Sequence, residues 1–137
     1  MSNIEKLLTR KEDLYFDFKS SNITADKLAE TVIGMANANG GEILVGIDDK
    51  TKTVDGFDNT HFHKINELQR TLYDFTRGDI KISYENIEFE EMTLFLLNVA
   101  ASTKLISKSN GDVFLRQGDS TKKLTREQVK SLEYERN

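Results

Sequence analysis

The chain has no cysteine, no proline and no tryptophan among its 137 residues. Without cysteine it can form no disulfide, no thiolate metal site and no thiol nucleophile. Without proline, its turns must come from eight glycines and from Asn, Asp and Ser residues. It also lacks an apolar run near twenty residues and a basic-then-apolar N-terminus, so we expect neither a membrane span nor a signal peptide. The absence of cysteine fits a reducing compartment, and we expect a cytoplasmic protein.

The length and composition of the chain are those of one domain. Domains cluster near this length, and about 140 residues are enough to bury a core without disulfide or metal staples. Hydrophobic residues make up 37% of the chain and charged residues 31%, which is polar but not a disordered composition. We therefore expect a single domain over residues 1–137.

Charge is distributed unevenly along the chain. The net charge of −4 argues against a protein that coats nucleic acid by bulk attraction. Residues 1–103 contain 11 basic and 18 acidic side chains, whereas residues 104–137 contain 8 and 5. Any nucleic-acid contact is therefore expected in the C-terminal third, although random scatter of surface charge is an alternative explanation.

Hydrophobic spacing and turn signals predict an α+β domain. The expected helices are a short one containing residues 4–8, then 24–39 and 62–75, and one starting at a capping box formed by Thr125 and Gln128. The expected strands are 14–19, 43–47, 80–89, 92–99 and 112–116. The alternation of apolar residues changes phase within 80–89, which predicts a bulge near Asn86. Because the later strands look like hairpins, we expect a mixed, mainly antiparallel sheet with flanking helices.

Carboxylates near two strand ends are candidate metal ligands. Glu12 and Asp17 flank the first strand, and Asp48 and Asp49 directly follow the strand at 43–47. Converging carboxylates can hold Mg²⁺ or Mn²⁺, and such ions assist phosphodiester cleavage. Acidic residues after a strand are more often turn formers or helix caps, so both interpretations stay open.

A segment rich in hydrogen-bond donors follows the strand at 112–116. It contains cationic residues, two hydroxyls and a glycine turn, namely Arg116, Gly118, Ser120, Thr121, Lys122 and Lys123. Such a segment offers N–H, hydroxyl and cationic contacts to phosphate oxygens. The alternative is an ordinary polar connection between a strand and a helix.

Four ordered blocks of the sequence resemble the Schlafen AlbA-like domain family. They are Glu12-x4-Asp17-Phe18-Lys19, the run ANANGGEILVGIDD at 36–49, the run VDGF at 54–57, and the run FLRQGDST at 114–121. The resemblance extends over residues 12–132. It implies an α+β fold of the AlbA-like type and a nucleic-acid-binding domain, which in this family is often the N-terminal domain of a longer protein.

The resemblance also implies an alternative, enzymatic function. In Schlafen ribonucleases a three-carboxylate site binds metal, and its counterparts here are Glu12, Asp17 and Asp48, with Asp49 as a substitute for the third. A divalent-metal-dependent endoribonuclease acting on structured RNA such as tRNA would use Mg²⁺ or Mn²⁺ at this site. Asp17 stands where the family has Glu, which shortens the side chain by one methylene. Schlafen nucleases combine two such lobes, so this single lobe implies a homodimer.

Two functions are therefore expected, a module that binds RNA or DNA phosphates and, as the alternative, the endoribonuclease. The binding module would use the donor-rich segment, the basic last helix and the lysine after the second carboxylate. Its expected contact residues are Lys19, Arg116, Ser120, Thr121, Lys122, Lys123, Arg126 and Lys130.

Overall fold

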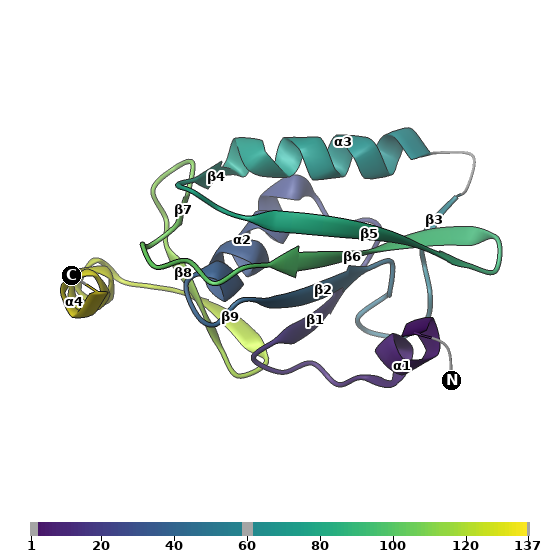
Figure 1. Ribbon diagram of the computed structural model, residues 1–137, viewed down its shortest axis with the longest axis horizontal. Helices are drawn as coiled ribbons and strands as arrows, with labels where there is room; N and C mark the ends of the chain where they lie inside the picture. The colour runs from purple at the N-terminus through teal and green to yellow at the C-terminus, as the bar shows by residue number, and fades with distance from the viewer. Residues whose placement is uncertain (1–2, 59–61, 137) are drawn as a thin grey trace.

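The alternating and continuous apolar runs form a five-stranded mixed sheet in the computed structural model, which describes residues 3–58 and 62–136 (Figure 1). The strands of this sheet are β1 (Phe16–Lys19), β2 (Gly41–Val45), β3 (Phe57–Asp58), β5 (Ile82–Phe89) and β6 (Met92–Val99). β1 lies parallel to β2, whereas β6 pairs antiparallel with β2, β3 and β5. The expected α+β class and mainly antiparallel sheet are confirmed.

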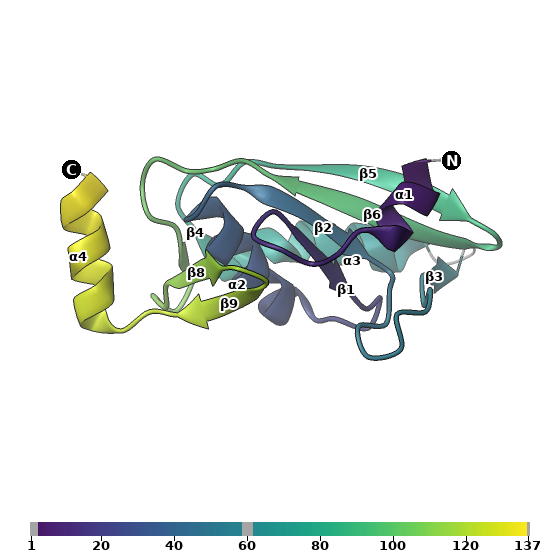
Figure 2. The same ribbon diagram turned by 90° about the horizontal axis from the view of Figure 1, so that it is seen from below.

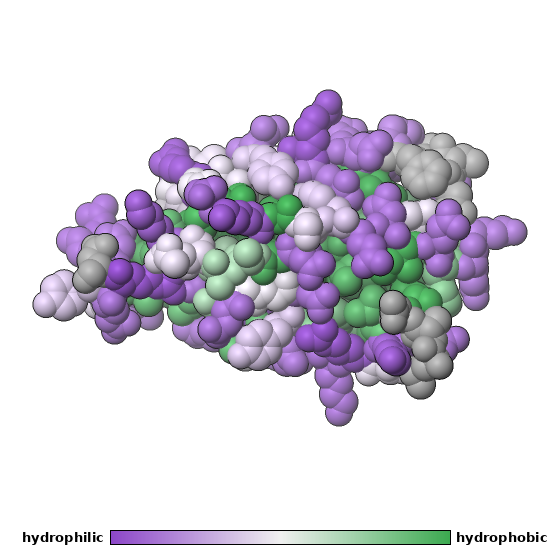
Figure 3. Space-filling view, viewed as in Figure 1, coloured by the Kyte–Doolittle hydropathy of each residue, from purple (hydrophilic) through white to green (hydrophobic). Residues whose placement is uncertain are grey.

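Two helices cover one face of the sheet and build the main core. They are α2 (Ala25–Ala36) and α3 (Phe62–Leu72), the latter followed by a 3₁₀ turn, Tyr73–Phe75. Their apolar sides pack on alternate residues of the central strands, including Ile43, Val45 and Phe95. A second, smaller core on the opposite face lies under α1 (Asn3–Thr9) and contains Phe16, Phe18 and Leu44, and Figure 3 shows hydrophobic side chains gathered on this side of the sheet.

The helix α2 begins where its sequence predicts. Thr24 caps it, since its side-chain oxygen accepts a hydrogen bond of 3.2 Å from the Lys27 N–H. At its other end α2 stops at Ala36, with Asn37 as its C-cap, so the helix is shorter than the predicted 24–39. A turn follows and closes at Gly40, which has a φ of 76°, a conformation that favours glycine, and whose N–H donates to the Met35 carbonyl at 2.8 Å. The chain then enters β2 in the centre of the sheet.

The C-terminal third forms a second layer next to α2. A short pair, β4 (Thr76–Arg77) and β7 (Ser107–Lys108), lies beside a hairpin of β8 (Phe114–Gln117) and β9 (Ser120–Lys123). The hairpin packs so closely on α2 that a Cβ at Gly34 would lie 2.8 Å from Thr121 Cγ2. The segment after Arg116 is therefore a strand and turn, where the sequence predicted only a loop.

The last helix, α4 (Arg126–Arg136), projects away from the sheet (Figure 2). The expected capping box is confirmed, because the Thr125 N–H donates to Gln128 Oε1 at 2.8 Å and the Gln128 N–H donates to Thr125 Oγ1 at 3.2 Å. Every residue of α4 is described and none is buried, so Val129 and Leu132 face the body only partly shielded.

Two sequence expectations about strands are wrong. The bulge near Asn86 is replaced by an unbroken register from the Ile82–Val99 pair to the Phe89–Met92 pair. The phase changes because Ile82 packs toward α2 and α3, whereas Phe89 packs into the smaller core on the other face. The strand expected at 43–47 ends at Val45, because Gly46 has a φ of 128° and lies where a Cβ would meet Leu94.

Within the described ranges, no helix is both long enough and apolar enough to cross a membrane.

Candidate nucleic-acid interface

Arg116 lies inside the protein, although the sequence predicted it as a phosphate contact. It projects from β8 toward β1, and only 3% of the residue is exposed. Its Nη1 donates to Asp17 Oδ2 at 2.7 Å and to Thr121 Oγ1 at 3.3 Å. Its Nη2 donates to the carbonyls of Asp13 at 2.9 Å and Phe16 at 3.2 Å. Because the guanidinium forms hydrogen bonds with all of these groups, it cannot contact a phosphate without breaking some of them.

The hydroxyls of the hairpin are also engaged by neighbouring groups. Ser120 Oγ donates to the Gln117 carbonyl at 3.2 Å, across the turn that contains Gly118 with its φ of 60°. Thr121 Oγ1 accepts from Arg116, and its methyl group packs against α2. Lys122 on the same strand is exposed to solvent.

Three of the expected cationic residues line one groove. Lys123 at the end of β9 and Arg126 and Lys130 on α4 face a hollow of about 710 Å³ between this helix and the loop at 110–113. We call this hollow the basic groove. The two helix residues stand one turn apart, so both side chains lie on the same side of α4. Gly111 borders the groove with a φ of 97° and nothing within 4 Å of its Cβ position, so no described atom fills the space beside this loop. The N–H groups of Gly111 and Asp112 already donate, to the Lys108 carbonyl and to Asn110 Oδ1, both at 2.9 Å.

The basic groove contains acidic side chains as well. Asp112 forms an ion pair of 3.3 Å with Lys123, whose side chain is 61% exposed. Glu133, further along α4, also lines the groove. A pair this exposed contributes little to stability, so a phosphate can replace Asp112 as the partner of Lys123 at small cost.

The carboxylates expected to bind metal have other partners. Glu12 Oε1 and Asp49 Oδ1 both accept from Lys52 Nζ, at 3.0 and 2.7 Å. Hydrogen bonds first to Asp49 and then to Glu12 raise the pKa of Lys52 above its usual value. This ammonium group therefore occupies the space between the two carboxylates as a positive charge, and it also lies 5.3 Å from the centre of the Phe18 ring.

Asp48 forms a turn. Its Oδ1 accepts from the N–H groups of Lys50 at 2.9 Å and Thr51 at 3.1 Å. These hydrogen bonds, the one from Thr51 first, lower the pKa of the Asp48 carboxyl below its ordinary value. The turn-forming interpretation of this residue accounts for its geometry.

The observed arrangement does not fit the metal site that the resemblance implies. Asp17 is 2% exposed, its Oδ2 is bound by Arg116, and its Oδ1 has no hydrogen-bond partner in the described part of the chain. Among the residues that the structure describes, no group of three His, Cys, Asp or Glu side chains is placed to hold a metal ion. Glu12, Asp17, Asp48 and Asp49 thus have structural partners that explain their positions without a divalent cation.

Lys19 lies at the far end of β1 from the groove residues. Its Nζ is 3.5 Å from Asp17 Oδ2, and its side chain is 26% exposed. It shares the carboxylate with Arg116, which places it in the same charge cluster rather than on an open phosphate-binding surface.

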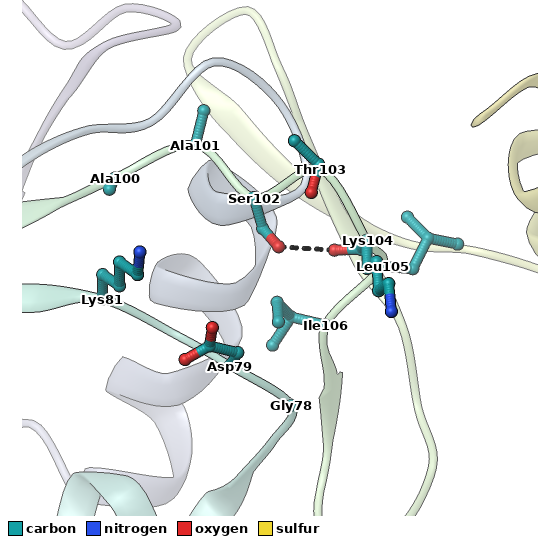
Figure 4. A pocket seen from close by; sticks show the side chains of 10 residues that line it. All are labelled: Gly78, Asp79, Lys81, Ala100, Ala101, Ser102, Thr103, Lys104, Leu105 and Ile106. Atoms are coloured by element: carbon teal, nitrogen blue, oxygen red, sulfur yellow. Dashed lines mark hydrogen bonds between the residues drawn. The ribbon is translucent and has the colours of Figure 1, made fainter. Parts of the chain in front are cut away.

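A further hollow of about 410 Å³ lies between the 78–81 segment and the 100–106 loop (Figure 4). Asp79 and Lys81 come from one side, and the loop on the other is braced by a 2.6 Å hydrogen bond from Ser102 Oγ to the Lys104 carbonyl. This hollow contains none of the residues that the sequence singled out.

Three residues with clear roles were missed from the sequence. Asn37 is fully buried and donates to the carbonyls of Ile106 and Phe114, both at 2.9 Å, while its Oδ1 accepts from the Ile106 N–H at 2.7 Å. Arg136 donates to the Asn37 carbonyl and ties the end of α4 to the end of α2. Lys52 is the third. Asn37 stands inside the run ANANGGEILVGIDD, which was the available signal, but nothing local marked Arg136 or Lys52.

Comparisons with known proteins agree with this fold. The family model described as Schlafen, AlbA_2 matches residues 12–125. No curated protein matches the chain significantly. The DIP2311 protein from Corynebacterium diphtheriae is similar in structure, with a TM-score of 0.67 and 22% identity over 94% of this chain, which spans 27% of that one. The N-terminal domain of the "Putative ATP-dependent DNA Helicase RecG-related Protein" from Nitrosomonas europaea has a TM-score of 0.63 and 22% identity, with 91% of this chain and 95% of that one covered.

Proposed function

Because the chain belongs to the Schlafen, AlbA_2 family, we propose that it is a nucleic-acid-binding module whose basic groove holds phosphates. The observation that supports this most is the meeting of Lys123, Arg126 and Lys130 along one hollow. The name of the helicase-related relative, whose N-terminal domain has this fold, also supports an association with nucleic acid.

The charge distribution fits a local rather than a diffuse interface. The whole chain has a net charge of −4, so its overall charge does not attract a polyanion. Attraction then depends on places where cations cluster, and three cations line the basic groove. Lysine and arginine contacts of this kind fix position on the phosphate backbone without reading sequence.

The test is a binding titration with labelled RNA and DNA, compared between the parent and the triple variant Lys123→Ala, Arg126→Ala, Lys130→Ala. The matched control is Lys50→Ala, Lys64→Ala, Arg70→Ala, which removes the same charge from exposed positions outside the groove. We expect the groove variant to bind more weakly and to lower the slope of log affinity against log salt by about two to three. Equal losses of affinity in both triple variants would mean that binding is only diffuse electrostatic attraction. An unchanged affinity of the groove variant would exclude the basic groove as the binding site.

The two remaining expectations from the resemblance are tested separately. A homodimer is part of the proposal because the family resemblance implies a second lobe, and light scattering at high protein concentration would show twice the mass of the 15.7 kDa chain.

Cleavage of labelled tRNA in Mn²⁺ but not in chelator would support the endoribonuclease, which the geometry of the described carboxylates does not favour.

A further inference from the structure

Tyr134 is a large aromatic side chain left in solvent. It is 84% exposed, whereas the next most exposed tyrosines, Tyr15 and Tyr73, are 49% and 44% exposed. An aromatic ring this exposed has a free face with which a partner can make contact. Its position on α4 relates it to the basic groove.

Tyr134 continues the line of cations on α4. Arg126, Lys130 and Tyr134 follow one another at intervals of four residues, and each interval turns the helix by only about 40°. The three side chains therefore form one stripe, which starts in the basic groove and ends at the exposed ring. The helix α4 projects from the body of the domain (Figures 1 and 2), and all three side chains of the stripe are exposed.

The two ends of the stripe suit different parts of a nucleotide. The cations at Arg126 and Lys130 suit phosphate. Tyr134 is flanked by Glu133 and Glu135, which repel phosphate but not an uncharged base. The distance of about 6 Å along the helix between Lys130 and Tyr134 is short enough for one strand to contact both.

The end of α4 is anchored, which keeps the ring in place. Arg136 donates to the carbonyls of Asn37 and Ser102, the latter at 3.4 Å. The first carbonyl lies at the C-terminal end of α2, where a cation is favoured by the helix dipole. With the capping box at one end and Arg136 at the other, the backbone of α4 is held at both ends, which sets where Tyr134 lies relative to the groove.

From these observations we propose that Tyr134 stacks on an unpaired base, so that the basic groove and this ring together bind single-stranded nucleic acid. The inference rests on the proposed function, since it assigns the strand whose phosphates the groove holds. Stacking on an aromatic side chain needs a base whose face is free, and a base inside a duplex is already stacked on its neighbours. The site therefore discriminates by strandedness rather than by sequence.

The experiment compares Tyr134→Ala and Tyr134→Phe with the parent on four probes of equal length: single-stranded RNA, single-stranded DNA, duplex DNA, and a single strand with abasic sites. We expect the parent to prefer the single strands. Tyr134→Ala should weaken single-strand binding about fivefold to a hundredfold, the amount that one base stack supplies, while Tyr134→Phe retains it. The abasic strand and the duplex should be insensitive to both changes.

Tyrosine fluorescence gives a second readout, because the chain has four tyrosines and no tryptophan. Stacking should quench the emission of the parent on addition of a single strand, and Tyr134→Phe should remove that part of the quenching. Since Tyr134 is so exposed, neither variant should alter the thermal midpoint appreciably.

The outcomes separate the two proposals. If the groove variant loses binding while Tyr134→Ala binds single strands as tightly as the parent, or if the parent prefers duplex, the stacking inference is wrong and the proposed function stands. If the parent binds none of the probes, both are wrong.

Discussion

Arg116 and Asp17, 99 positions apart in the sequence, form an ion pair of 2.7 Å in which both side chains are almost completely buried. The pair joins the C-terminal hairpin to β1 and, through the carbonyls of Asp13 and Phe16, fixes the chain that leads into that strand. The arginine of the FLRQGDST block thus has a structural role. The cations available for phosphate, Lys123, Arg126 and Lys130, come after this block in the sequence.

Removing Arg116 should destabilise the protein rather than its ligand complex. Arg116→Ala leaves the buried Asp17 carboxylate with only the partly exposed Lys19 as a cationic neighbour, and removing one member of a buried ion pair costs about 3–5 kcal/mol of the free energy of unfolding. Urea denaturation measures this cost. Under conditions in which the variant stays folded, its affinity for nucleic acid should equal that of the parent. A stable Arg116→Ala protein with weakened binding would instead make Arg116 a phosphate contact.

Asn37 should be as important for stability as any apolar core residue. Asn37→Ala removes three hydrogen bonds that connect the end of α2 to Ile106 and Phe114, and it leaves their backbone groups buried without partners. We expect a loss of at least about 2 kcal/mol in the free energy of unfolding, measured by chemical denaturation. Asn39→Ala, two residues further on at an exposed position, is the control and should have little effect.

The turn at Asp48 predicts a pH dependence at acid pH. The pKa of this carboxyl is lowered by backbone hydrogen bonds from Thr51 and Lys50, so the ionised form is favoured in the folded state. The stability that this ionised carboxylate contributes to the folded state is complete above its unfolded pKa of 3.8. It is lost as the pH falls through the lower pKa of the folded state. An NMR titration of the Asp48 carboxyl carbon should give a midpoint below 3.8. A midpoint at or above that value would show that the turn does not hold the charge.

Divalent cations should bind weakly, because Lys52 already lies between Glu12 and Asp49. Calorimetric titration of the parent with Mn²⁺ should show no saturable binding. Lys52→Met keeps the length of the side chain and removes its charge, so any latent affinity of these carboxylates should appear first in that variant. Saturable binding to the parent that disappears in Glu12→Gln would contradict this prediction and restore the carboxylate site.

The sequence predicted elements well where the signal was local. The cap at Thr24 and the capping box at Thr125 are both predicted from neighbouring residues, and both are present. The second strand of the hairpin was missed because Ser120–Lys123 is polar, and its pairing with β8 depends on packing against Gly34 in α2.

The site was harder to predict because its geometry depends on distant contacts. Nothing near Arg116 indicates that Asp17 will bury it, and nothing near Glu12 indicates that Lys52, 40 residues later, will pair with it. The resemblance to the family located the right segments. Within them, only tertiary structure separates the cations that build the fold from Lys123, Arg126 and Lys130, which face the open groove.

Amide chemical-shift mapping of the intact chain, during titration with a short single strand, would show whether nucleic acid binds in the basic groove. We expect the largest shifts in the 110–113 loop, at Lys123 and along α4 from Arg126 to Tyr134, with little change near Glu12, Lys19 and Lys52. Shifts concentrated at those three residues, with α4 unchanged, would contradict this expectation.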